Sequence, residues 1–254
     1  MCIVHCKINH AARYKYPNNS ISKMISKIYK TLLKRYDKQG WWPITPPGHV
    51  EPVYDKGPRT AKQKLEVCFG AILTQNTSWK NVEKAIVNLN KHDLIEINKI
   101  LRIPKSQLAQ YIKPSGYFNQ KAIKLKSFCQ YIKDNYQSSL ELFFEKTIKT
   151  LRRELLSIHG IGPETADSII LYAAAKPSFV VDTYTKRILS RYGSISKKAS
   201  YDEIKELFES QFGKNSQVYN EYHALIVKLA KTHCLAKYPT CSSCPLTKGC
   251  KKDY

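Results

Sequence analysis

Apolar positions along the chain recur at helical spacing, and strand-like alternation is rare. Between residues 20 and 36 the apolar side chains form one stripe with lysines opposite: Ile21, Met24, Ile25, Ile28, Leu32 and Tyr36. Similar stripes recur at residues 61–73, 82–89, 118–132, 151–158, 204–208 and 218–229. The strand-like run from Ser178 to Val181 is too short to build a sheet. The pattern therefore predicts an all-α protein.

Two local signals mark where the helices stop and start. Residues 40–60 contain Gly40, Pro43, Pro46, Pro47, Gly48, Pro52, Gly57 and Pro58. Such a density of proline excludes a helix and predicts an ordered loop or a linker. Ser200 with Glu203 forms a capping box, which predicts that a helix begins there.

The chain is strongly basic, with 42 Lys and Arg against 20 Asp and Glu and a net charge of +22. Nucleic acid, an anionic membrane or an acidic protein would satisfy this charge, and lysines on solvated helix faces are the alternative. The excess is greatest in residues 1–38 and 228–254. The chain has no apolar run of the roughly 18 residues that a membrane span needs. The N-terminal residues lack a secretory pattern, so we expect a protein that is not secreted.

Four of the eight cysteines lie in the last 21 residues, spaced C-x6-C-x2-C-x5-C: Cys234, Cys241, Cys244 and Cys250. Four thiolates on so short a loop can converge on one metal centre, either zinc or a four-iron cluster. Free or disulfide-linked cysteines are the alternative. Cys68 and Cys129 lie on apolar helix stripes, which predicts buried, inert thiols.

Glycine and proline mark a hairpin between two helices at residues 155–167. Gly160 and Gly162 flank Ile161, and Pro163 takes the first position of a new helix. The hairpin can therefore present free backbone N–H groups to an anion such as phosphate. A plain helical hairpin is the alternative. Further along, Asp182 follows an apolar run and precedes a helical pattern, which by itself predicts a helix N-cap.

Taken together, four motifs resemble endonuclease III and the helix-hairpin-helix base-excision glycosylases. They are L-T-Q-N-T at residues 73–77, G-I-G-P-E-T-A at 160–166, V-V-D-T at 180–183 and the cysteine-rich terminus. The resemblance runs from about residue 65 to 250. It implies a two-lobed all-α fold: a six-helix barrel (61–176) ending in the hairpin, and a cluster lobe (177–254) that holds a [4Fe–4S] cluster on the four cysteines. Residues 20–60 form the N-terminal helix, which packs with the cluster lobe, and the Pro-rich loop. Residues 1–19 are then a basic tail, in which Cys2, His5, Cys6 and His10 could also bind a metal.

The same resemblance implies how DNA is bound and how the base is removed. Double-stranded DNA would lie between the lobes, with the hairpin on a backbone phosphate through Gly160, Ile161, Gly162 and Thr165. Gln75 would fill the space left by a flipped nucleotide, and an exposed amide is the alternative. Asp182 would be the catalytic aspartate that stabilises positive charge on the sugar.

Glu164 occupies the hairpin position at which the strand-cutting members carry a lysine. Because a carboxylate cannot form a Schiff base, the resemblance implies a monofunctional glycosylase, with Glu164 either in the catalytic site or a first-turn acid. Lys176 and Lys186 do not occupy the matching position. A bifunctional glycosylase and AP lyase acting on oxidised pyrimidines, and a non-catalytic iron-sulfur DNA-binding protein, remain open as alternatives.

An aromatic segment indicates the base that is removed. Trp41, Trp42 and Pro43 resemble the aromatic segment of bacterial 3-methyladenine glycosylases. Electron-rich rings suit a cationic alkylated purine through stacking and cation–π attraction. The alternative is that both tryptophans anchor the loop to the core. We further expect a monomer without a membrane partner, located at the cytoplasmic nucleoid if the source is prokaryotic.

Overall fold

Helices joined by short loops make up the chain in the computed structural model, which describes residues 20–55 and 57–254. The α-helices are α1 (Ser20–Tyr36), α2 (Ala61–Leu73), α3 (Trp79–Lys91), α4 (Ile97–Arg102), α5 (Lys105–Tyr111), α6 (Phe118–Tyr136), α7 (Leu140–Phe144), α8 (Ile148–Ser157), α9 (Pro163–Ser168), α10 (Thr183–Tyr192), α11 (Tyr201–Phe212) and α12 (Ser216–Thr232). Three short helical turns are η1 (Lys113–Ser115), η2 (Ile169–Ala173) and η3 (Cys241–Ser243). No strand forms within the described ranges, so the all-α prediction is confirmed. The expected tail, residues 1–19, lies outside the described residues.

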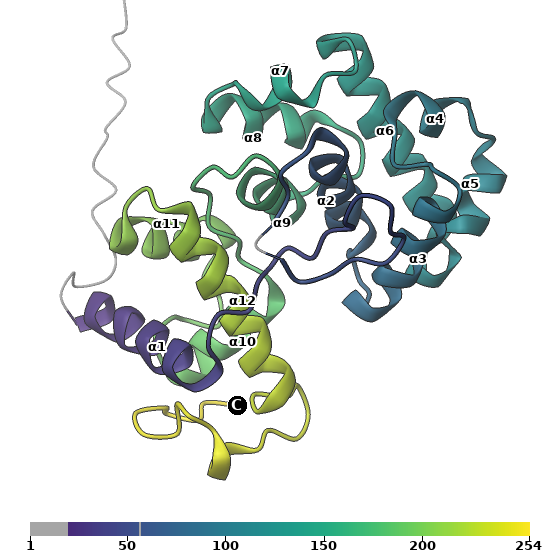
Figure 1. The fold of residues 1–254 in the computed structure, drawn as a ribbon. Coiled ribbons are helices and arrows are strands. Elements are labelled where there is room, and N and C mark those ends of the chain that lie inside the picture. Colours follow the sequence, from purple (N-terminus) through teal and green to yellow (C-terminus); the bar gives the residue numbers. More distant parts are fainter. Residues whose placement is uncertain (1–19, 56) are drawn as a thin grey trace, which may run out of the picture.

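Helices α2 to α9 gather at one end of the molecule, and α1 lies with α10, α11 and α12 at the other (Figure 1). In the first group, α6 packs against α2, α4, α5 and α7. In the second group, α1 packs against α11 and α12, and α10 packs against α12. The turn η2 contacts both α2 and α12, so it joins the two groups. Among the described residues, no helix combines the length and apolar character of a membrane span.

Helix starts follow the local sequence. Ser200 and Glu203 make the predicted capping box at α11, and Thr60 with Gln63 makes a second one at α2. On α1 the predicted apolar stripe is buried in part: Ile25 and Leu32 are fully enclosed against the C-terminal helices, whereas Ile21 and Met24 stay partly exposed. Burial of these faces provides most of the stability of such helices.

The described part of the loop between α1 and α2 seats two tryptophans on the core. The backbones of Ile44 and Val53 pair across it, and the Thr45 N–H donates to Glu66 Oε1 at 2.8 Å. Trp42 is 5% exposed and lies over Gly70 of α2, where an added Cβ would be 3.0 Å from the indole. Glycine at position 70 therefore permits the close approach of this ring.

A buried lysine holds the C-terminal end of α2. Lys121 on α6 is 2% exposed, and its Nζ donates to the carbonyl oxygens of Leu73 and Ser115, each at 2.7 Å. Burial, together with the charge of Lys124, lowers the pKa of Lys121 to about 8. The two carbonyls lie where helices end and lack partners within the helix. Lys121 therefore fixes the start of the loop that carries Gln75.

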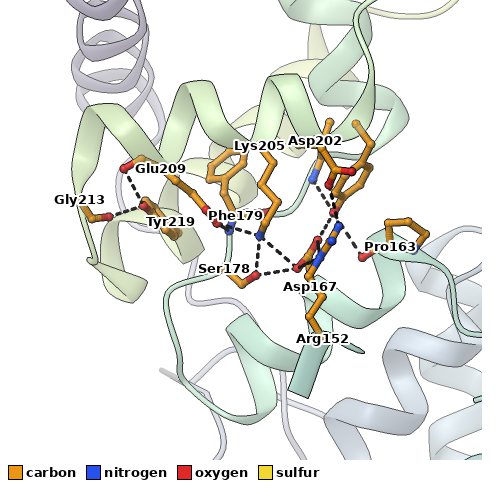
Figure 2. A network of polar contacts seen from close by, with 12 residues as sticks. Arg152, Pro163, Asp167, Ser178, Phe179, Asp202, Lys205, Glu209, Gly213 and Tyr219 are labelled. Atoms are coloured by element: carbon orange, nitrogen blue, oxygen red, sulfur yellow. Dashed lines mark hydrogen bonds and ion pairs between the residues drawn. The ribbon is translucent and has the colours of Figure 1, made fainter. Parts of the chain in front are cut away.

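A second buried charge ties α9 to α8 and α11 (Figure 2). Asp167 on α9 is fully buried and accepts hydrogen bonds from Arg152 Nε at 3.2 Å and Lys205 Nζ at 3.1 Å. Ser178 Oγ and Tyr201 Oη donate to the same carboxylate at 2.6 and 2.9 Å. Because every one of these partners comes from outside α9, the network fixes the hairpin helix relative to α11.

Candidate active site

Asp182 lies at the start of α10, where it is both buried and hydrogen-bonded. Its side chain caps the helix as predicted: Oδ1 accepts from the Thr185 N–H at 2.7 Å and from Thr185 Oγ1 at 2.8 Å. The residue is 8% exposed, and its second oxygen, Oδ2, lies 3.4 Å from His223 Nε2. Burial acts to raise the pKa of Asp182, but His223 and the Thr185 hydrogen bonds outweigh it and lower the pKa. The carboxylate is therefore ionised at neutral pH.

The hairpin between α8 and α9 has the shape that its glycines predict. Gly160 has φ +81°, a left-handed conformation, and a Cβ there would lie 2.5 Å from the Lys124 side chain. Gly162 has φ −97°, so it does not use the left-handed region, and the space around it is open. Pro163 is the first residue of α9, as predicted. The open side of Gly162 leaves the N-terminal N–H groups of α9 accessible to an anion.

Gln75, in the loop after α2, is held against this hairpin. Its Nε2 donates to the Gly160 carbonyl and to Thr165 Oγ1, each at 3.0 Å. Lys124 Nζ donates to the Gln75 amide oxygen. Gln75 is therefore not a freely exposed amide, and the structure places the predicted wedge residue next to the predicted phosphate-binding hairpin.

These residues open onto one cavity of about 680 Å³, within the size range of small-molecule sites. Eight of the residues proposed from the sequence line it: Trp41, Trp42, Gln75, Gly160, Gly162, Glu164, Thr165 and Asp182. Pro43 and Ile161 are buried nearby and are not among the lining residues. Segments more than 100 residues apart in the chain therefore meet at one site.

Aromatic rings form one wall of this cavity. Trp42 makes edge-to-face contacts with Trp79 and Tyr172, with ring centroids 5.1 Å apart in both pairs. Trp41 packs edge-on against Trp79, with centroids 5.3 Å apart. Trp41 is only partly buried, whereas Trp42 is buried. The tryptophans therefore anchor the loop and line the cavity at once, so the two interpretations of the sequence do not exclude each other.

The lining residues that sequence reasoning missed include four with aromatic or ionisable side chains: Trp79, Tyr172, His223 and Lys231. Trp79 follows directly after L-T-Q-N-T-S, so its position beside a motif was a usable signal. The other three come from η2 and α12, which no motif marked. Their convergence on Asp182 depends on the packing of η2 against α12.

The ionisable groups at the cavity differ in their environments. Glu164 is accessible at the mouth, yet desolvation by the surrounding protein and the negative charge of Asp182 raise its pKa. Desolvation also lowers the pKa of Lys231, while Asp182 and Glu83 act in the opposite direction. Lys176 and Lys186 are not among the lining residues. Lys231 is therefore the lysine among the described residues that line the cavity.

The four C-terminal cysteines follow α12. Their thiols are partly exposed, and Cys234 Sγ accepts from Arg191 Nη1 at 3.5 Å. Burial raises the pKa of Cys244, and the charges of the other three cysteines raise it further. Among the described residues, no three His, Cys, Asp or Glu side chains are arranged as a metal site. Four cysteine thiolates are nevertheless, by their chemistry, a donor set that both zinc and a four-iron cluster accept. Cys68 and Cys129 are fully buried, and burial raises the pKa of both thiols, as their stripe positions predicted.

Comparison with known proteins agrees with this site. Residues 69–214 match the HhH-GPD superfamily of base excision DNA repair proteins. A protein of Methanocaldococcus jannaschii, named as a candidate DNA repair glycosylase, is 48% identical over 229 residues, covering 90% of this chain and 96% of the relative. The structure of an H. pylori 3-methyladenine DNA glycosylase bound to 1,N6-ethenoadenine is similar with a TM-score of 0.65 and 31% identity, covering 83% of this chain and 97% of that one.

An endonuclease III–DNA complex has the same fold, with a TM-score of 0.73 at 20% identity, covering 91% of this chain and 95% of that one. The chain therefore belongs to the HhH-GPD superfamily of base excision DNA repair proteins. Within that superfamily it is a DNA glycosylase, and its partner is DNA.

Proposed function

We propose that this protein is a monofunctional glycosylase that hydrolyses the N-glycosidic bond of an alkylated purine, such as 3-methyladenine, flipped from double-stranded DNA. The observation that carries the proposal is that Asp182 and a wall of aromatic rings line the same cavity beside the hairpin. Glycosidic chemistry on a stacked base is sterically blocked, so the nucleotide must leave the helix first.

Asp182 acts on the sugar. Departure of the base develops positive charge on the deoxyribose, and a fixed carboxylate in a poorly solvated cavity stabilises that charge. The lowered pKa of Asp182 keeps the group negative for this role. The same carboxylate can orient or deprotonate the attacking water. Its helix-capping bonds hold Oδ1, which leaves Oδ2 as the oxygen that turns toward the substrate.

The aromatic wall selects the base. Rings of Trp41, Trp42 and Trp79 offer electron-rich surfaces to which a cationic methylated purine binds by stacking and cation–π attraction. Such a lesion already has a weakened glycosidic bond, so it needs little acid assistance to leave. The H. pylori relative, named a 3-methyladenine DNA glycosylase, supports this choice of substrate.

Glu164 supports hydrolysis without strand cleavage, because a carboxylate cannot form the imine of a lyase. One observation favours a second candidate, a glycosylase that also cleaves the strand. Lys231 lines the cavity, and desolvation lowers the pKa of its amine, which increases the fraction available as a nucleophile. Any lyase activity would therefore depend on Lys231.

The remaining parts of the proposal concern the cluster and the complex with DNA. Cys234, Cys241, Cys244 and Cys250 would hold a [4Fe–4S] cluster, which ties the C-terminal loop together and takes no part in the reaction. Gln75 would leave the hairpin and fill the gap in the duplex, and the protein would act as a monomer. The iron and zinc content of the purified protein tests the cofactor assignment, since stoichiometric zinc without iron would reject the cluster.

The test is a panel of duplexes bearing 3-methyladenine, hypoxanthine, uracil, thymine glycol or 8-oxoguanine, each scored with and without alkali. We expect release of 3-methyladenine, with strand breaks only after alkali. Borohydride trapping on abasic DNA should give no covalent adduct. An adduct that disappears in Lys231→Met and persists in Lys186→Met would instead establish the lyase candidate. Preference for an oxidised pyrimidine would reject the substrate assignment.

A further inference from the structure

His223 lies between the Asp182 carboxylate and the buried side chain of Tyr172. On α12, the His223 side chain is 13% exposed, and its Nε2 lies 3.4 Å from Asp182 Oδ2. Its other ring nitrogen, Nδ1, lies 2.6 Å from Tyr172 Oη. Nε2 is buried and makes no hydrogen bond within the described part of the chain. The three side chains come from η2, α10 and α12 and form one row.

The tyrosine determines where the imidazole proton is. Burial, with the negative charges of Asp182 and Glu221, raises the pKa of Tyr172 well above its usual value, so the phenol keeps its proton. The hydrogen bond to Nδ1 is the one that Tyr172 Oη makes within the described residues, so we infer that the phenol donates its hydrogen there and that Nδ1 accepts it. The remaining ring hydrogen of His223 then lies on Nε2, facing Asp182. The opposite tautomer would direct a lone pair at the carboxylate.

We propose that Tyr172 and His223 act as positioning residues that orient Oδ2 of Asp182 toward the flipped sugar while leaving the carboxylate charge intact. This inference rests on the proposed glycosylase function. The two oxygens of Asp182 have different neighbours: among the described residues, Thr185 donates to Oδ1, and His223 Nε2 lies 3.4 Å from Oδ2. At this distance a neutral N–H attracts Oδ2 through its dipole, whereas a cation beside it would cancel the charge that catalysis uses.

Other charged groups do not replace His223 in this arrangement. Glu164 and Lys231 line the same cavity, but neither has an ion pair with Asp182 within 4.0 Å among the described residues. Loss of the Nε2–H donor should therefore leave Oδ2 free to rotate out of position. Misplacement of a reacting group by about 1 Å can cost on the order of 100-fold in rate.

The experiment compares His223→Phe, His223→Gln and Tyr172→Phe by single-turnover release of 3-methyladenine from duplex DNA, with binding of undamaged duplex measured alongside. A glutamine amide can place an N–H near the position of Nε2, whereas phenylalanine cannot. We expect His223→Phe to slow base release about 10- to 100-fold with unchanged duplex binding. His223→Gln should recover most of that rate, and Tyr172→Phe should fall between them.

Two further measurements separate positioning from a structural role. In an Asp182→Asn background, His223→Phe should cause no additional loss, because its effect passes through the carboxylate. Nitrogen-15 NMR of the histidine rings in the wild-type protein should show the His223 proton on Nε2. Wild-type rates in His223→Phe, a full additional loss in the Asp182→Asn background, or a proton on Nδ1 would each overturn the proposal.

The NMR measurement does not depend on activity. If the wild-type protein fails to release 3-methyladenine, the proposed substrate is wrong, while the tautomer still tests the arrangement of Tyr172, His223 and Asp182. Should His223→Phe unfold at the assay temperature, His223→Gln and Tyr172→Phe carry the kinetic comparison. A rate in Tyr172→Phe equal to that of the wild type, or a proton on Nδ1, would then reject the inference.

Discussion

Replacing Asp182 separates its chemical role from its structural one. The carboxylate caps α10 through Oδ1, at 2.7 Å from the Thr185 N–H, and provides the charge that faces the cavity. Asparagine keeps an oxygen for the cap but loses the charge. Alanine loses both. Since Asn and Asp cap helices about equally well, Asp182→Asn should change the cap energy little, whereas Asp182→Ala should cost about 1 kcal/mol.

The catalytic loss should be much larger than the structural one. Removing one fixed group that stabilises transition-state charge typically lowers kcat by about 100- to 1000-fold, which is about 3 to 4 kcal/mol. We expect at least this loss in Asp182→Asn, since its charge faces the developing cation directly. Asp182→Ala should lose a similar factor, although it is less stable.

The assay is single-turnover release of the damaged base, with duplex affinity and thermal melting of each variant measured in parallel. Equal rates in the two variants with unequal melting temperatures would support the assignment, because catalysis then follows the charge and stability follows the cap. A wild-type rate in Asp182→Asn would remove Asp182 from catalysis. A loss proportional to the fall in melting temperature would make its role structural.

Three further predictions concern the fold and the hairpin. Asp167→Asn should lower the free energy of unfolding by about 1.5 to 3 kcal/mol, because it removes the fully buried charge from Arg152 and Lys205, which keep the more exposed carboxylates of Asp202 and Glu209. Asp202→Asn, exposed beside the same arginine, should cost under about 1 kcal/mol in chemical denaturation. The pKa of Lys121 falls from 10.5 to about 8 on folding, so the unfolded chain binds more protons than the folded protein between these pH values. From pH 7 to 10 the free energy of unfolding of the wild type should therefore rise by about 2.5 kcal/mol relative to that of Lys121→Met. A difference between the two proteins that stays constant with pH would contradict this. Gly160→Ala should destabilise the protein by about 1 to 2 kcal/mol, because φ at this position is +81°. Gly162→Ala should fold normally and weaken DNA binding. Equal melting temperatures of the two variants would refute this contrast.

Much of the fold follows from local signals in the sequence. Helical spacing of apolar residues, the Ser200 capping box and Pro163 at the start of α9 each act within a few residues, so the sequence alone predicted them. The helix-capping role of Asp182 was predictable for the same reason. Its assignment to catalysis came from the family motif, because capping alone does not distinguish a catalytic aspartate from a structural one.

Only the tertiary structure decided which side chains surround that aspartate. Tyr172, His223 and Lys231 carry no motif, and they reach the cavity because η2 packs between α2 and α12. Contacts between residues far apart in the chain depend on how helix faces fit together, which periodicity does not specify. The sequence by itself therefore determined the helices, the hairpin and the family. Packing determined the aromatic wall, the environment of Glu164 and the partners of Asp182, because burial and neighbouring charge exist only once the helices have met.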